Sequence, residues 1–280
     1  MTAYLKRKII NHMALISAFV TAIIGLFWLV FILADVIYNG FSFITLALFT
    51  EESAPPMLGG GGLKHAIIGQ IIITFFSIII GVPVGILGGT YLSEYGRNNR
   101  LAKFISTVSD IMVSVPAIVI GTFVYALFVR PWGGFNGLSG SIALAIIMIP
   151  VVLRTTEDMM KLVPWSLREA AFALGAPYYK VIVQIVYKSA ATGIFTGILL
   201  AIARIAGEAA PLLFTSFNNA FLTTKITEPM PSLTVTIFQY AMSPYESWHK
   251  LAWAASLIIM LFILLFTVIG RLIIKWRYKK

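Results

Sequence analysis

The 280-residue sequence contains no cysteine, so disulfides, thiolate metal sites and catalysis by a thiol are excluded. It also lacks the Gly-x-x-x-x-Gly-Lys-Ser/Thr loop that cradles nucleotide phosphates, so the chain is not expected to hydrolyse ATP by itself. No Ser/His/Asp or Glu/His constellation stands near the end of an apolar run. We therefore expect no enzymatic activity, no cofactor and no metal in this chain.

Charge is scarce as well. Only 11% of the residues are charged, against about 25% in ordinary soluble domains, while 59% are hydrophobic. Backbone exposed to lipid must satisfy its own hydrogen bonds, so each long apolar run predicts a helix. The first run is too long for the core of a signal peptide and lacks a clear cleavage site, so we expect it to be retained. The sequence thus predicts an all-α membrane protein with six spans, at about 13–38, 66–92, 104–129, 139–153, 190–214 and 251–274.

The few basic residues are unevenly distributed. If the chain has six spans, 16 of its 21 lysines and arginines fall on one side of the membrane and 4 on the other, with Arg204 inside the fifth span. Basic residues concentrate on the cytoplasmic side of membrane proteins. This pattern predicts that both termini are cytoplasmic, and an odd number of spans would destroy it.

The cytoplasmic stretch at about 154–189 has the signals of a helix, a turn and a second helix. Pro164 can begin a helix, Gly175 permits a left-handed helix end, and Pro177 prevents continuation. Leucine and alanine repeat between them at helical spacing. Such a helix suits docking into a groove of a soluble partner, and the alternative is an amphipathic helix that rests on the lipid surface.

Two charges in the predicted fifth span are candidates for a transport pathway. Arg204 and Glu208 are four residues apart, so on a continuous helix they share one face. A guanidinium inside the membrane is costly and suits a phosphate-like oxyanion. The alternative is a structural ion pair between helices. Elsewhere we expect Asp110 to pair with Arg100 or Lys103.

The carboxylates of Glu157 and Asp158 are expected to be solvated, and the alternative is contact with a partner. In the same stretch, Glu169-Ala170-Ala171, then three residues, then Gly175 resemble the EAA loop of the permeases of bacterial ABC importers. The chain has Tyr187-Lys188 where that family usually has Leu-Pro. The sequence is also similar to the PstA family of phosphate-importer permeases from about residue 60 to its end, most clearly over 88–96, 115–121, 167–171, 203–215 and 232–235.

The resemblance implies a MetI-like fold and a multi-pass subunit of the bacterial inner membrane. It implies a first unit, 1–60, with the N-terminal tail, first span and outer loop, and an importer transmembrane domain, 61–280. Glu169, Ala170, Ala171 and Gly175 would then contact an ATP-binding subunit, and Arg204 and Glu208 would line the substrate pathway. ATP and Mg²⁺ would be bound by that partner.

The resemblance further implies a second permease subunit (PstC-like), a dimer of the ATP-binding subunit (PstB-like) and an extracytoplasmic phosphate-binding protein (PstS-like). Partners are thus the lipid bilayer and proteins, and no nucleic acid is expected. Two alternatives stay open from the residues themselves. The same machine could import another anion, such as sulfate or molybdate, or the chain could be a passive channel or a membrane scaffold.

Overall fold

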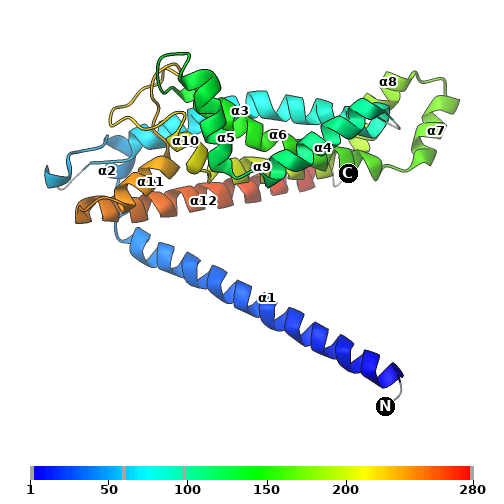
Figure 1. Ribbon diagram of the computed structural model, residues 1–280, viewed down its shortest axis with the longest axis horizontal. Coiled ribbons are helices and arrows are strands. Elements are labelled where there is room, and N and C mark those ends of the chain that lie inside the picture. Colours follow the sequence, from blue (N-terminus) through cyan, green and yellow to red (C-terminus); the bar gives the residue numbers. More distant parts are fainter. Residues whose placement is uncertain (1–2, 59–60, 97–98, 278–280) are drawn as a thin grey trace.

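The computed structural model describes residues 3–58, 61–96 and 99–277, and within these ranges the chain is built from helices. Three of the basic residues counted above, Arg97, Lys279 and Lys280, lie outside the described residues. Figure 1 shows an elongated bundle from which one long helix, α1, stands apart. The elements are α1 (Ala3–Phe41), α2 (Ala47–Thr50), η1 (Pro56–Leu58), α3 (Lys64–Thr90), η2 (Tyr91–Tyr95), α4 (Arg100–Ser114), α5 (Ala117–Val124), η3 (Tyr125–Val129), α6 (Gly137–Lys161), α7 (Trp165–Ala173), α8 (Tyr178–Val181), η4 (Ile182–Val186), α9 (Tyr187–Ala206), α10 (Ala210–Leu213), α11 (Leu233–Ala241) and α12 (Glu246–Arg277).

Among the described residues, five helical segments are long and apolar enough to cross a membrane, so the chain is a multi-pass membrane protein. They are Ala3–Phe41, Lys64–Tyr95, Gly137–Lys161, Tyr178–Ala206 and Glu246–Trp276. A sixth crossing exists only if α4 and the α5–η3 segment count together, and these are bent by 107°. The span predicted over 104–129 is therefore not one continuous helix but two segments that meet at Pro116. Val115 and Pro116 are extended, because a proline disfavours the helical conformation of the residue before it.

Two further spans have bounds other than those placed on the apolar runs. The fourth, placed at 139–153 and expected to borrow residues from its cytoplasmic flank, does so and continues as α6 to Lys161. The fifth span, predicted at 190–214, begins at Tyr178 and ends at Ala206. The helix stops there because Gly207 follows and Pro211 has no N–H to donate to the carbonyl four residues earlier. The short α10 resumes after this break.

The core forms where α3 and α6 pack against each other, with α9 beside α6. Glycines on α3 allow the two backbones to approach closely: a Cβ on Gly85 would lie 2.6 Å from the Cβ of Val152, and one on Gly89 would lie 2.5 Å from the Leu153 carbonyl oxygen. The hydroxyl of Ser77 donates across this interface to the Ser141 carbonyl oxygen at 3.0 Å. Small residues and interhelical hydrogen bonds of this kind hold helices together in lipid.

Helix α5 lies against α10. This contact brings together the two helical segments that are interrupted, α4–α5 and α9–α10. A Cβ on Gly121 would lie 2.7 Å from the Cα of Pro211, so only glycine permits this approach. Helix α1, by contrast, packs on α12 near its C-terminal end, where Gly40 faces Leu257 and Trp253. No residue in the most apolar 18-residue window of α1 is buried, and Figure 1 shows the helix diverging from the bundle.

Candidate functional site

The predicted helix–turn–helix is present between α6 and α9. Helix α7 begins directly after Pro164 and spans Trp165–Ala173, and α8 begins directly after Pro177. Gly175 has φ +79°, the left-handed conformation that glycine adopts without strain. The local signals in the sequence were sufficient here, because two prolines and one glycine fix where the helices begin and end.

Helix α7 presents one face outward and one inward. Glu169, Ala170 and Gly175 are exposed, and Leu174, just beyond the helix, is 89% exposed. Ala171 is buried on the opposite face, so it packs against the chain itself. Figure 1 shows α7 at the same end of the bundle as the beginning of α1 and the end of α12.

The inward face of α7 carries a charge that the sequence reading did not single out. Arg168 forms a buried ion pair with Glu94 of η2, the turn that continues α3. The same guanidinium donates through Nη2 to the Met160 carbonyl oxygen at 3.0 Å. The available signal was a carboxylate at the end of an apolar run, which needs a partner of opposite charge.

Arg204 and Glu208 lie on either side of the helix break. Arg204 is in the last turn of α9 and is exposed, whereas Glu208 follows the end of the helix and is half-buried. They therefore do not share a helix face, and the expectation based on four-residue spacing is wrong. In the part of the chain that the structure describes, neither side chain forms an ion pair.

Two buried side chains from other helices hold the backbone of this break. Gln70 of α3 donates through Nε2 to the Ala206 carbonyl oxygen at 3.3 Å. The hydroxyl of Thr234, at the start of α11, donates to the Glu208 carbonyl oxygen at 3.1 Å. A broken helix leaves carbonyl groups without intrahelical partners, and these contacts supply them. Neither residue was identified from the sequence, since both are remote from the break along the chain.

A second ionic cluster lies at the end of α6. Arg154 donates through Nε to Asp110 of α4 at 3.1 Å and through Nη1 to Glu157 at 2.9 Å, and Lys161 also pairs with Glu157. The expected pairing of Asp110 with Arg100 or Lys103 is therefore wrong, and so is the expected solvation of Glu157, which is buried. Because α6 continues to Lys161, the side chains of Arg154, Glu157 and Lys161 lie one turn apart along the same helix.

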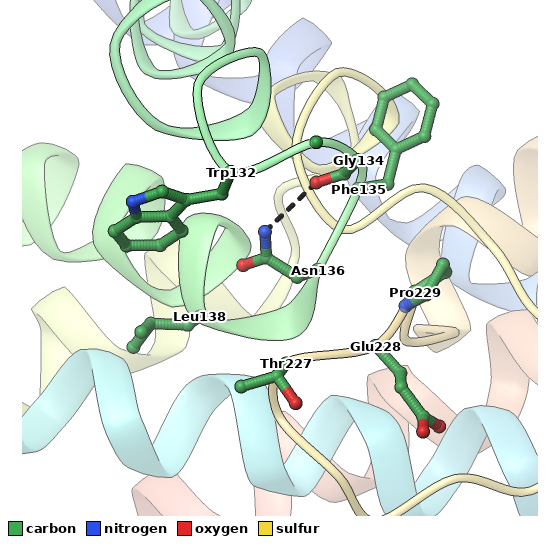
Figure 2. A pocket seen from close by; sticks show the side chains of 9 residues that line it. Trp132, Gly134, Phe135, Asn136, Leu138, Thr227, Glu228 and Pro229 are labelled. Atoms are coloured by element: carbon green, nitrogen blue, oxygen red, sulfur yellow. Dashed lines mark hydrogen bonds between the residues drawn. The ribbon is translucent and has the colours of Figure 1, made fainter.

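At the other end of α6, beside Gly137, the chain forms a cavity of about 620 Å³. Figure 2 shows Trp132, Phe135 and Asn136 on one side of it and Glu228 on the other. Hydrogen bonds from the Thr223 hydroxyl and the Lys225 ammonium hold the pKa of the Glu228 carboxyl below its ordinary value. The carboxylate of Glu228 is therefore ionised and paired with Lys225, and the cavity lies at the opposite end of α6 from α7.

Comparison with known proteins gives a consistent picture. Residues 81–278 match the family described as binding-protein-dependent transport system inner membrane component. The phosphate transport system permease protein PstA of Yersinia pestis is 50% identical over 94% of this chain and 89% of its own length. PstA of Pasteurella multocida (strain Pm70) is 47% identical over 95% of each chain.

Solved structures share the fold. A chain of the MetNI methionine ABC transporter, in an inward-facing conformation, aligns with a TM-score of 0.62 at 18% identity, over 80% of this chain and 98% of that one. A chain of a bacterial ABC transporter involved in the import of the acidic polysaccharide alginate aligns with a TM-score of 0.64 at 15% identity, over 99% and 100%. The chain therefore belongs to the binding-protein-dependent transport system inner membrane components, within the PstA family of phosphate permeases.

Proposed function

We propose that this chain is a permease subunit of an ATP-driven importer of inorganic phosphate. The observation that carries the proposal is the 50% identity to a phosphate transport system permease over 94% of the chain, which spans both α7 and the helix break. ATP and Mg²⁺ belong to a separate ATP-binding subunit, and a substrate-binding protein delivers the anion from the other side. The family implies both classes of partner.

The outward face of α7 is the proposed contact with the ATP-binding subunit. Glu169, Ala170 and Gly175 are exposed on it and free to meet a partner, while Ala171 contributes by packing α7 onto its own chain. Closure of an ATP-binding dimer would displace α7, and the spans would then open toward the other side. The turn at Gly175 defines how far α7 can protrude.

Arg204 and Glu208 are the proposed pathway charges. Arg204 is exposed and lies at a break where backbone groups are held by Gln70 and Thr234. An intramembrane arginine without a partner of its own needs water, an anion or another subunit around it. A planar guanidinium matches two oxygens of a phosphate at once.

Six spans, both termini cytoplasmic and location in the bacterial inner membrane complete the proposal. The sixth crossing would be the bent pair of α4 and α5–η3, counted as one span. In Figure 1 the start of α1, the end of α12 and α7 lie toward one end, which supports a common cytoplasmic side. The apolar surface of α1, unburied in this chain, supports a second permease subunit (PstC-like) beside it. The ATP-binding dimer is then PstB-like and the delivering protein PstS-like.

The test is reconstitution of the chain with its candidate partner subunits in liposomes, with labelled phosphate as substrate and excess sulfate as competitor. We expect ATP-dependent uptake that resists sulfate and is abolished without the ATP-binding subunit. Movement of sulfate or molybdate instead of phosphate would support the importer function but contradict phosphate as the substrate. Uptake without ATP would favour a passive channel, and no uptake of any solute would favour a scaffold.

A further inference from the structure

The ion pair between Arg168 and Glu94 is the most deeply buried charge contact that the structure describes. The side chain of Glu94 is 1% exposed and that of Arg168 is 6% exposed. The two residues come from different segments: Glu94 lies in η2, which continues α3 without interruption, and Arg168 lies on the inward face of α7. The pair therefore connects the helix that meets the partner to a helix of the membrane core.

Further contacts converge on the same two residues. The hydroxyl of Tyr178, at the start of α8, donates to the Glu94 backbone oxygen at 3.0 Å. Its ring stacks on Phe172 of α7, with centroids 6.0 Å apart, and meets Tyr95 edge to face at 5.5 Å. Together with the bond from Arg168 to Met160, these contacts tie the end of α3, the end of α6, α7 and α8 into one cluster.

This cluster fixes the orientation of α7 but adds little to the free energy of unfolding. A buried ion pair gains little net free energy over an apolar pair of similar size, because both charges must leave water. It does fix geometry, because the planar guanidinium addresses a carboxylate and a carbonyl in different directions. Elsewhere α7 is largely exposed, with only Arg168 and Ala171 buried among its residues. The ion pair is therefore the main polar contact that orients α7, beside the apolar contacts of Ala171 and Phe172.

We infer that Glu94, Arg168 and Tyr178 are positioning residues that lock α7 to α3 and α6, so that a displacement of α7 moves the membrane core with it. This inference rests on the proposed contact of α7 with an ATP-binding subunit. Glu94 and Arg168 act through α7 and touch neither the transported anion nor the nucleotide.

The decisive variant replaces both charges at once. Glu94→Met with Arg168→Met removes the ionic connection without leaving one charge buried alone, so folding is retained. Arg168→Lys keeps the charge but loses the planar fork, and Lys161→Met is the matched control, because Glu157 keeps its pair with Arg154. Each complex is reconstituted in liposomes with the ATP-binding subunit, and phosphate moved and ATP hydrolysed are measured together.

We expect the double variant to assemble. Its ratio of phosphate moved to ATP hydrolysed should fall by about fivefold or more. Arg168→Lys should lie between it and the parent, and Lys161→Met should match the parent. A purely structural role would lower assembly and leave this ratio unchanged. An unchanged ratio in assembled double-variant complexes would overturn the inference.

A distance measurement tests the anchor without reference to the substrate. Because the chain has no cysteine, Asp158→Cys on α6 and Ala173→Cys on α7, both exposed, allow two spin labels to be placed in the intact complex. We expect one narrow distance distribution in the parent and a broad one after Glu94→Met with Arg168→Met. Equal widths would overturn the anchor. If the parent moves no phosphate but the widths differ, the substrate proposal fails while the anchor stands.

Discussion

Two arginines of this molecule, one on α7 and one at the break after α9, have opposite surroundings. Arg168, on α7, is buried and paired with Glu94, with a backbone carbonyl as a second acceptor. Arg204, in the last turn of α9, is exposed in this chain and has no acidic partner among the described residues. Both side chains belong to an apolar protein in which a bare charge is expensive.

The difference separates a charge that fixes the position of α7 from a charge that is free to bind a ligand. A guanidinium that is buried between a carboxylate and a carbonyl of its own chain is not accessible to a mobile ligand, and it fixes geometry. A guanidinium whose donors are free needs something outside the chain, either water, another subunit or an anion. The comparison thus predicts that Arg168 variants change the stability of the protein and the attachment of α7. Arg204 variants are expected to change the rate of phosphate uptake instead.

Arg168→Met alone should show the largest effect. It leaves the Glu94 carboxylate buried without its cation, and breaking a buried pair in this way costs about 3–5 kcal/mol. Arg204→Met should change the free energy of unfolding by only ~0.5 kcal/mol, since its side chain is exposed. Thermal unfolding of both variants in the assembled complex, beside the parent, measures this contrast. Equal losses would erase the distinction between the two arginines.

Arg204→Gln should then separate transport from stability. Losing charge-assisted hydrogen bonds worth roughly 1.5–3 kcal/mol corresponds to about 10- to 150-fold slower phosphate uptake. Arg204→Lys, which keeps the charge but not the fork, is the matched control and should retain part of the uptake. The measurement is initial uptake rate in liposomes at limiting phosphate. Uptake equal to the parent in Arg204→Gln would make Arg204 a structural residue.

Gly175→Val sharpens the comparison by altering α7 without touching either arginine. A branched side chain at φ +79° costs roughly 1–3 kcal/mol, and no atom lies close enough to clash, so the effect is one of backbone strain alone. We expect lower ATP-dependent uptake in Gly175→Val and near-parent uptake in Gly175→Asn, since asparagine tolerates this conformation.

Gly133 provides the control for strain elsewhere, because it has φ +82°, is equally open and lies beyond the other end of α6. Gly133→Val should destabilise the protein to a similar degree while leaving the coupling of ATP hydrolysis to uptake intact. If both variants lose coupling equally, the turn after α7 has no special role.

The smallest effect is expected around Arg204 rather than at it. Thr234→Val removes the hydroxyl that donates to the Glu208 carbonyl oxygen. Losing this hydrogen bond costs about 1 kcal/mol of free energy, and we expect the rate of phosphate uptake to fall about fivefold. Thr236→Val is the matched control on the same helix, because its buried hydroxyl has no partner in the described structure. Thr236→Val should leave phosphate uptake unchanged. If both variants lowered uptake equally, the hydrogen bond at the helix break would have no specific role in transport.

Local signals in the sequence predicted α7 and its turn correctly. Pro164, Gly175 and Pro177 act on their immediate neighbours, so their effect can be read without knowing the fold. Gly207 and Pro211 indicate that the helix can loosen after Ala206. The predicted end of the span at 214 was wrong because the apolar run continues to Phe214, and hydrophobicity does not report where a helix is interrupted.

The charge pairs were missed for a different reason. Glu94 meets Arg168, and Asp110 meets Arg154, only because distant helices are brought together. From a single sequence, the pairings within a helix turn are the ones that spacing can predict. The membrane class and the exposed α7 were thus predictable, while the anchor of α7 and the surroundings of Arg204 required the fold.

The contact of Gly121 with Pro211 bears on how the chain is made. Helix α5 cannot enter the bilayer as a straight continuation of α4, because the two are bent by 107°. Its resting place is formed by α10, which leaves the ribosome much later. The contact between Gly121 and Pro211 can therefore form only after residues 210–213 have been synthesised, so the final packing of α5 is set by the C-terminal half of the chain.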